Sequence, residues 1–402
     1  MNPLHSHIDG RRARQFDAPV RIAYVNALFI IGTLGTLITP ALLAVWGPRL
    51  HWTQSQLGLA AAVELVTLAL GSLSGLYWQR RWDWRFVAMG ALLLAMLGNL
   101  ACVRLDDFAG VCIARAASGL GGGLLCAIYS AFLANTHSPG RNIAITTFVQ
   151  IGVEAAFLYF STSVAEALGA TGLFALLAGL SGALIPLIRL LPACWPSDSS
   201  APAEAAVPDE RPRRAYPILL SFAPFILFQA GVYTFLGDFG RLAAGLDVPQ
   251  TLHAIGLSVV FSALGSVAAY FLDGRAGLLL PISGVILLLI GMMFAIICDS
   301  TSASLFLLYI SLLQAGWIFL NCYLYSALID ANRLLVAAAT PVSSFGSAFG
   351  ASAMGYVLEQ RGLPGALSLS VAALGLTALL TIPFLRRGRA PAVADGGSVR
   401  NL

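Results

Sequence analysis

Long apolar stretches separated by short polar segments run through most of the 402-residue chain. A helix needs about 20 apolar residues to cross the hydrocarbon core of a bilayer, and about twelve stretches meet that requirement. These spans are predicted at residues 22–46, 55–77, 86–104, 109–134, 142–165, 171–191, 216–240, 252–272, 277–297, 303–328, 334–358 and 363–385. The pattern therefore predicts an all-α membrane protein of about twelve transmembrane helices.

One segment near the middle of the chain breaks the apolar pattern. Residues 192–215 are rich in Pro, Ser, Ala and charged residues, a composition that cannot bury enough apolar area to fold. We expect this segment to link two six-helix bundles. The predicted organisation is an N-terminal tail at 1–21, a first bundle at 22–191, a cytoplasmic linker at 192–215, a second bundle at 216–385 and a C-terminal tail at 386–402.

The two predicted halves resemble each other in sequence. Ala69-Leu-Gly-Ser72 ends the second span of the first half, and Ala263-Leu-Gly-Ser266 ends the second span of the other half. Both stretches enter a short turn. A parallel repeat with a binding site near the bilayer midplane, between the halves, is a recurrent plan of secondary transporters.

The distribution of arginine predicts the orientation. All 23 basic residues are arginine, and most of those outside the spans lie in the tails, the linker and the turns on the same side. The opposite side holds only Arg49, Arg104, Arg241 and Arg361. Because basic residues are concentrated on the cytoplasmic side of membrane proteins, both termini are expected there, and the protein is expected in the cell inner membrane.

Composition narrows the function classes. Hydrophobic residues make up 58% of the chain and charged residues 10%, against roughly a quarter charged residues in soluble domains. The net charge of +4 lies in loops and gives no support for nucleic-acid binding. The sequence has no metal-like cluster, no nucleotide-binding loop and no nucleophile–base pair, so neither a cofactor nor an enzymatic activity is expected.

A glycine motif in the fourth span carries a family resemblance. Arg115-Ala-Ala-Ser-Gly119-Leu-Gly-Gly-Gly123 resembles the RxxxGxG pattern found there in the major facilitator superfamily. In that family the arginine faces the central cavity and takes part in proton coupling or substrate binding. The family's turn between helices 2 and 3 is degenerate here, since Gln79 replaces its acid and Trp82 its second glycine. The fifth span lacks the GxxxGPxxGG motif of drug antiporters, which disfavours that subfamily.

Four polar side chains inside the first-half spans are candidates for proton coupling or substrate binding. An ionised side chain at the bilayer centre costs about 2.5–3.5 kcal/mol on insertion scales, so such residues usually have a partner or a function. Removal from water favours the neutral form of a carboxyl group, whereas a nearby arginine favours the charged form. The candidates are Glu64, Arg115, Glu154 and Gln150. A static ion pair between Arg115 and one glutamate is the alternative interpretation.

Polar and aromatic side chains at helical spacing suggest a substrate cavity. On the tenth span, Gln314, Trp317 and Asn321 share one face. Gln229 and Tyr233 flank Gly231 on the seventh span, where the helix could bend, and Asn26 lies on the first span. The predicted cavity residues are Asn26, Gln229, Tyr233, Gln314, Trp317 and Asn321. Hydrogen bonding between helices is the alternative role for each of them.

The sequence thus favours a secondary active transporter that works by alternating access. The leading hypothesis is proton-coupled uptake of a small organic solute. An organic acid is one candidate, because Arg115 would supply a cation to the cavity. The main alternative is proton-antiport efflux of amphipathic drugs or metabolites, with Glu64 or Glu154 contacting a cation. The expected partners are the solute, protons and the lipid bilayer, and the protein is expected to be a monomer.

Overall fold

The computed structural model describes residues 16–193, 212–272, 277–299, 302–332 and 335–385. Most of both predicted tails, most of the linker at 192–215 and the second-half turn at 273–276 lie outside the described residues. Within the described part every regular element is a helix. The predicted all-α fold class is confirmed.

Three helices of the first half begin at side-chain caps. Thr53 forms a capping box with Gln56, and the carboxylates of Asp83 and Asp107 accept hydrogen bonds from backbone N–H groups of the turns that follow them. The elements are α2 (Pro19–Leu37), α3 (Thr39–Leu50), α4 (Gln54–Trp78), α5 (Trp84–Cys102), α6 (Phe108–Leu133), α7 (Pro139–Leu168), α8 (Gly172–Leu184) and the 3₁₀ helix η1 (Ile185–Leu190).

The second half repeats this order of elements. It contains α9 (Pro212–Thr234), α10 (Leu236–Ala244), α11 (Val248–Leu272), α12 (Leu279–Cys298), α13 (Ala303–Ala331) and α14 (Val336–Leu385). The long α14 consists of two consecutive helices that meet at a kink, because Gly362 has the non-helical angles φ 60° and ψ −153°. Glycine tolerates this positive φ because it has no Cβ. Counting both parts of α14, the described helices account for all twelve predicted spans.

The first and seventh spans, predicted as continuous helices, are each broken near the same end of the molecule. The break lies at Ile38 (φ −95°, ψ 15°) and at Phe235 (φ −106°, ψ 16°), so the two halves share it. In the first half, Thr36 and Thr39 bond to backbone carbonyls one turn earlier, and Pro40 begins the next helix. The bend that the sequence suggested at Gly231 instead lies four residues later, at Phe235. Gly231 itself packs against the backbone of α14.

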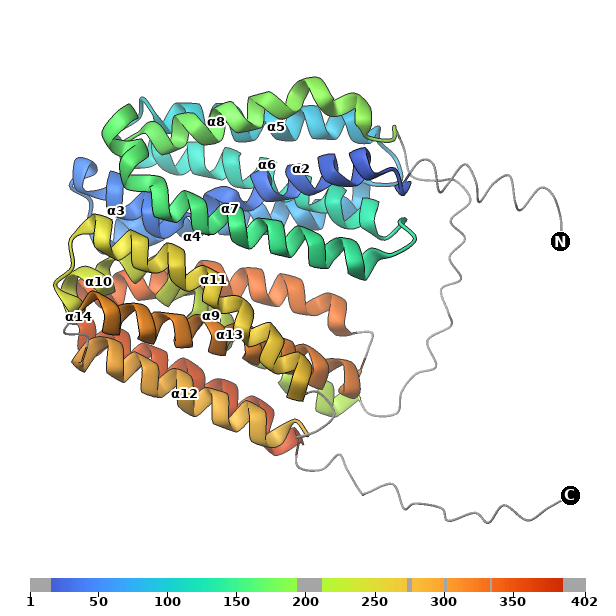
Figure 1. The fold of residues 1–402 in the computed structure, drawn as a ribbon. Coiled ribbons are helices and arrows are strands. Elements are labelled where there is room, and N and C mark those ends of the chain that lie inside the picture. Colours follow the sequence, from blue (N-terminus) through green and yellow to red (C-terminus); the bar gives the residue numbers. More distant parts are fainter. Residues whose placement is uncertain (1–15, 194–211, 273–276, 300–301, 333–334, 386–402) are drawn as a thin grey trace, which may run out of the picture.

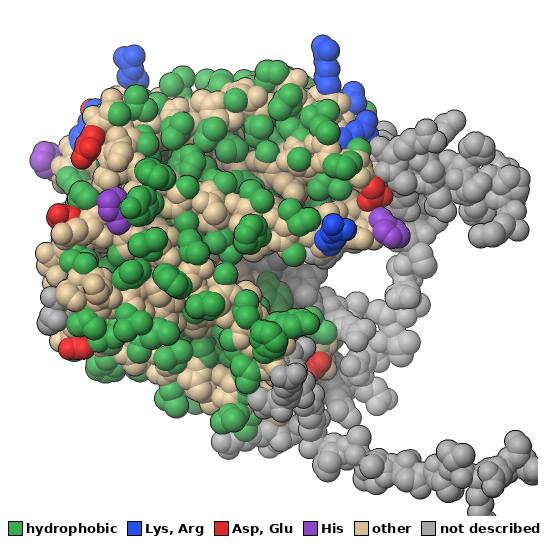
Figure 2. All heavy atoms as spheres, viewed as in Figure 1, with side chains coloured by type: hydrophobic (Ala, Val, Ile, Leu, Met, Phe, Trp, Pro, Cys, Tyr) green, Lys and Arg blue, Asp and Glu red, His purple; other side chains and the backbone are tan. Residues whose placement is uncertain are grey.

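The two six-helix halves lie side by side, with their helices roughly parallel (Figure 1). The halves approach each other most closely at the end that carries α3 and α10, opposite the end where α2 begins and α14 ends. On the face shown in Figure 2, hydrophobic side chains spread over the middle of the molecule, whereas the visible charged side chains lie mostly toward its two ends. This distribution matches a bilayer around the middle of the molecule and water at its ends.

Contacts between α4 and α14 close the end of the molecule that carries α3 and α10. The backbone N–H of Ser55 donates to Glu359 Oε2 over 2.9 Å, and Gln54 Nε2 donates to Asp238 Oδ1 over 3.5 Å. Asp238 also pairs with Arg241 over 3.6 Å, and its side chain is only 14% exposed. The contacts of Gln54 and Ser55 join the halves, so Asp238 belongs to the interface between them.

Gly58 allows the closest approach at this end. A Cβ built on Gly58 would lie 2.5 Å from the carbonyl oxygen of Ala351 in α14, a distance that real Cβ atoms do not adopt. We therefore expect Gly58→Val to push α4 and α14 apart and to open this end. Spin labels at positions 49 and 361, in a background without native cysteines, would report the opening. The distance between them, measured by electron–electron double resonance, would be longer in the variant.

Gly90 on α5 provides the control, since a Cβ there meets no atom within 4 Å. Gly90→Val should leave the label distances unchanged. An unaltered distance distribution in correctly folded Gly58→Val protein would contradict the role given to this contact.

Candidate functional site

A cavity of about 520 Å³ lies between the two halves. It receives side chains from α2, α3, α4 and α7 of the first half and from α9, α11, α13 and α14 of the second. Its polar and aromatic lining consists of Thr36, Thr39, Thr147, Gln150, Glu154, Gln229, Tyr233, Thr234, Ser262, Ser266, Gln314, Trp317, Asn321, Tyr325, Ser343, Ser344 and Ser347. Of the described residues in this lining, Glu154 is the one with a carboxyl side chain, and none is an arginine or a histidine.

Glu154 makes a contact that crosses the interface between the halves. Tyr233 on α9 lies with its hydroxyl oxygen 2.5 Å from Glu154 Oε1 on α7 and 2.6 Å from the carbonyl oxygen of Leu37. Leu37 is the last residue of α2, so its carbonyl has no partner within that helix. The break in the first span therefore exposes a backbone acceptor in the cavity, and Tyr233 reaches it.

The three oxygen atoms set a requirement for hydrogens. A tyrosine hydroxyl has one hydrogen and can donate it to one acceptor, whereas both the Leu37 carbonyl and an ionised Glu154 can only accept. A protonated Glu154 would supply a second donor. It would donate to the oxygen of Tyr233, while Tyr233 donates to Leu37. Both short contacts are hydrogen bonds at once only when Glu154 carries a proton.

The amides of the cavity differ in how far their bonding capacity is used. Gln150 Nε2 donates to Thr33 Oγ1 over 3.2 Å, and Gln314 Nε2 donates to Ser258 Oγ over 2.5 Å. By contrast, Gln229 Oε1 is buried and accepts no hydrogen bond from the described residues. A buried amide oxygen without a donor is unfavourable, so a donor from a bound molecule would satisfy it.

Two aromatic rings form one wall of the cavity. The rings of Tyr233 and Trp317 pack edge to face, with centroids 6.0 Å apart and an interplanar angle of 78°. This geometry is favourable for aromatic pairs. It fixes the position of the Tyr233 hydroxyl next to Glu154 and leaves an apolar wall beside polar groups.

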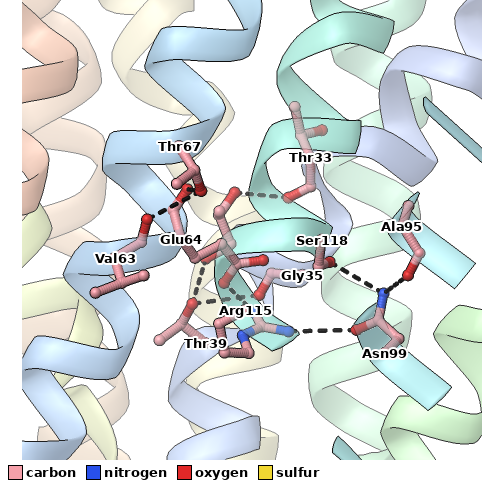
Figure 3. Close-up of polar contacts among 11 residues, drawn as sticks. Thr33, Gly35, Thr39, Val63, Glu64, Thr67, Ala95, Asn99, Arg115 and Ser118 are labelled. Atoms are coloured by element: carbon pink, nitrogen blue, oxygen red, sulfur yellow. Dashed lines mark hydrogen bonds and ion pairs between the residues drawn. The ribbon is translucent and has the colours of Figure 1, made fainter. Parts of the chain in front are cut away.

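Arg115 and Glu64 form a separate buried site inside the first half (Figure 3). Arg115 Nη2 pairs with Glu64 Oε2, and the two side chains are only 5% and 4% exposed. Arg115 Nη1 donates to Asn99 Oδ1 over 3.2 Å, and Asn99 Nδ2 donates to Ser118 Oγ over 3.2 Å. Each charge thus has an opposite charge or a hydrogen-bond partner, as buried ions require.

The glycines of the Arg115 motif explain why the pair forms. Gly119 and Gly123 of α6 pack directly against the backbone of α4, and Gly122 packs against Gly32 of α2. Small residues allow such close helix approach. Because α4 and α6 lie in backbone contact, Glu64 can reach Arg115. Its carboxylate also lies where a Cβ on Gly35 would clash.

The structure brings most of the predicted site residues together and separates three of them. Glu154, Gln150, Gln229, Tyr233, Gln314, Trp317 and Asn321 all line the central cavity. Glu64, Arg115 and Asn26 are buried but do not appear in its lining. Asn26 lies ten residues before Thr36 on the first span, almost three helical turns from the cavity.

Several lining groups were not predicted from the sequence. The hydroxyls of Thr36, Ser262 and Ser266 and the carbonyl of Leu37 belong to this set. Ser266 ends the Ala263-Leu-Gly-Ser266 repeat, so the internal repeat was a signal for one of them. The Leu37 carbonyl is available to Tyr233 because α2 ends at Leu37. In the sequence, the threonines ahead of Pro40 were the signal for this break.

A larger groove of about 740 Å³ on α11, α12 and α13 is lined almost wholly by apolar side chains, many of which are exposed on the outer face, including Leu264 and Leu280. It faces the region of the lipid. No group of His, Cys, Asp and Glu among the described residues could hold a metal ion.

The two halves and the cavity between them define the class of the protein: a multi-pass membrane transporter. A model of the Major Facilitator Superfamily matches residues 25–333. The chain therefore belongs to this superfamily, and the membership implies transport. No curated protein matches the chain in sequence.

Solved structures support the same fold. The nucleoside transporter NupG aligns with a TM-score of 0.68 and 13% identity over 93% of this chain and 100% of that chain. The xylose transporter XylE from E. coli, in a partially occluded inward-open conformation, aligns with a TM-score of 0.67 and 15% identity. The alignment covers 92% of this chain and 100% of that chain. A bacterial homologue of the human lysosomal transporter Spinster, inward-facing and unoccupied, aligns with a TM-score of 0.67 and 12% identity. The alignment covers 93% of this chain and 99% of that chain. At these identities the likeness concerns the fold.

Proposed function

We propose that the chain is a proton-coupled uptake carrier for a small polar organic solute, acting as a monomer in the cell inner membrane with both termini in the cytoplasm. Glu154 is the proton-coupling residue in this proposal, and the central cavity binds the solute. The observation that carries it is the contact of Glu154 with Tyr233, because these residues come from opposite halves and their hydrogen bonding depends on a proton.

The proposed mechanism follows from that contact. With a proton on Glu154, hydrogen bonds join α7, α9 and the broken end of α2 around the cavity. Loss of the proton removes one donor, which weakens the connection between the halves and leaves a carboxylate in the cavity. The two halves would then rock about the cavity, and the cavity would open to the other side of the membrane. Proton occupancy and the inter-half contact are thereby linked.

The geometry of the cavity also changes the kind of solute that we propose. The expectation of an organic acid depended on Arg115 as a cavity cation, but Arg115 pairs with Glu64 away from the lining. The proposal therefore assigns no anion-binding role to Arg115, and it treats the Arg115–Glu64 pair as a structural element of the first half. NupG and XylE carry the names of transporters for a nucleoside and for xylose. This supports a polar organic solute.

The same carboxylate favours a second candidate function. An unpaired Glu154 could bind a cationic amphipathic solute, and a proton would compete with that solute for the carboxylate. Competition of this kind gives antiport and efflux, whereas simultaneous occupancy gives symport. The two functions therefore predict opposite proton movements.

Solute-induced proton flux in proteoliposomes tests both functions. A pH-sensitive dye is trapped inside the vesicles, no gradient is imposed, and a solute that stabilises the purified protein is added outside. Symport predicts that the lumen becomes more acidic, because protons enter with the solute. A more alkaline lumen would support antiport, and the absence of any proton movement during measured solute entry would reject proton coupling.

A further inference from the structure

The lining of the central cavity contains information on the charge of the solute. Glu154 is the charged side chain that the described lining contributes, and the lining includes no described arginine or histidine. Arg115, which is buried in the first half, is already paired with Glu64 and bonded to Asn99. An anion in the cavity would therefore lose its hydration without gaining an opposite charge, which is strongly unfavourable.

The hydrogen-bonding groups indicate what the solute must offer. Gln229 Oε1 is buried and lacks a donor, so a bound O–H or N–H group would complete its bonding. Hydroxyl groups of serine and threonine side chains line both halves and can donate or accept. The site therefore suits a molecule with several hydroxyl or N–H groups.

The apolar part of the lining indicates a ring or a similar flat face. Trp317 and Tyr233 form an aromatic wall, and Leu65 and Leu68 of α4 and Ile226 of α9 add apolar surface. A volume of about 520 Å³ lies within the range of roughly 300–1,000 Å³ that is usual for small-molecule sites. A solute with one polar edge and one apolar face would fill such a space.

We propose that the central cavity binds an uncharged, donor-rich solute that carries a ring, of the size of an aryl glycoside or a nucleoside, and that it rejects organic anions. This inference rests on the proposed transport function and specifies its substrate class. With a proton on Glu154 the described lining has no net charge, which matches an uncharged solute. A cationic solute would require the ionised form of Glu154 and would compete with the proton.

Matched sets of three compounds test the charge preference. Each set differs at one substituent, with hydroxymethyl, carboxylate or aminomethyl at the same position: phenyl β-glucoside with its uronate and 6-amino analogue, and uridine with its 5′-carboxylate and 5′-amine. Thermal stabilisation of the purified protein in detergent is measured at constant pH for each compound. We expect stabilisation by a hydroxymethyl member and none by the carboxylate of the same set.

Three outcomes would overturn the inference. A carboxylate member that stabilises the protein as much as its hydroxymethyl counterpart would reject the exclusion of anions. Stabilisation by the amines alone would reassign the site to cations, and stabilisation by no hydroxymethyl compound would reject the proposed class.

A substitution locates the binding in the cavity. Gln229→Leu removes the unpaired acceptor, and we expect about ten-fold weaker binding of the stabilising compound. Gln360→Leu changes an exposed glutamine of α14, two residues before the break at Gly362, and should leave binding unchanged. Equal affinities in the two variants would contradict the assigned contact.

The experiments test the proposed substrate class and the proposed proton coupling separately. The stability measurements involve neither a membrane nor a gradient, so binding of anions would overturn the class while solute-driven proton flux could still occur. Conversely, solute entry without proton movement would reject coupling and leave the binding preference intact.

Discussion

Replacement of Glu154 by glutamine is expected to abolish proton-driven accumulation of the solute while solute binding and exchange persist. The glutamine amide can donate to the oxygen of Tyr233 as a protonated carboxyl group would, so Tyr233 stays free to donate to the Leu37 carbonyl. The variant would therefore resemble the protonated state permanently. Accumulation in proteoliposomes under an inward proton gradient, compared with counterflow under equal pH, measures the two properties.

Glu166→Gln is the matched control, since Glu166 lies exposed on the same helix α7. It should accumulate the solute as the unaltered protein does. Accumulation by Glu154→Gln that still follows the imposed gradient would remove Glu154 from the coupling mechanism. If Glu154→Gln lost exchange together with accumulation, the residue would be needed for binding, and the separation of roles proposed here would be wrong.

Substitution of Arg115 by methionine is expected to destabilise the protein severely. Removal of one partner from a buried ion pair leaves an uncompensated charge and typically costs about 3–5 kcal/mol. Glu64 would be that charge, enclosed between α4, α6 and Gly35. A large fall in the apparent melting temperature in detergent, followed by tryptophan fluorescence, would report the loss.

The double variant Glu64→Leu/Arg115→Met separates stability from function. Replacement of both buried charges by apolar groups is often neutral or stabilising, so most of the lost stability should return. Arg49→Met breaks an exposed pair with Asp106 and should lower stability by at most about 1 kcal/mol. A double variant that is stable but cannot move solute would contradict the purely structural role given to this pair.

The sequence predicted the features that depend on local pattern. Apolar length predicted the spans, and helical spacing placed Gln314 and Trp317 on one face. The cavity lining contains both of these residues, together with Gln150 and Glu154. A polar stripe on an otherwise apolar helix has to face protein or water, and this requirement is readable from one helix alone. The internal repeat also predicted the relation between the halves.

The features that depend on two helices at once were predicted only in part. An ion pair of Arg115 with one glutamate was the alternative interpretation, and the structure identifies that glutamate as Glu64. The position of Arg115 on a glycine-rich face showed that another helix packs there, but it did not show that this helix supplies Glu64. Similarly, Gly231 indicated flexibility, yet the chain uses the missing side chain for a close contact with α14 and breaks at Phe235. Local sequence describes the face of a helix, whereas the partner on that face is set by packing.

The Arg115–Glu64 pair has a consequence for the insertion of the growing chain into the membrane. Both residues belong to the first half, and Glu64 precedes Arg115 by 51 positions. Membrane proteins are synthesised from the N-terminus, so α4 already lies in the bilayer when α6 leaves the translocon. The arginine then meets its counter-ion on arrival, and the first bundle can neutralise its buried charges before the ribosome has translated the second.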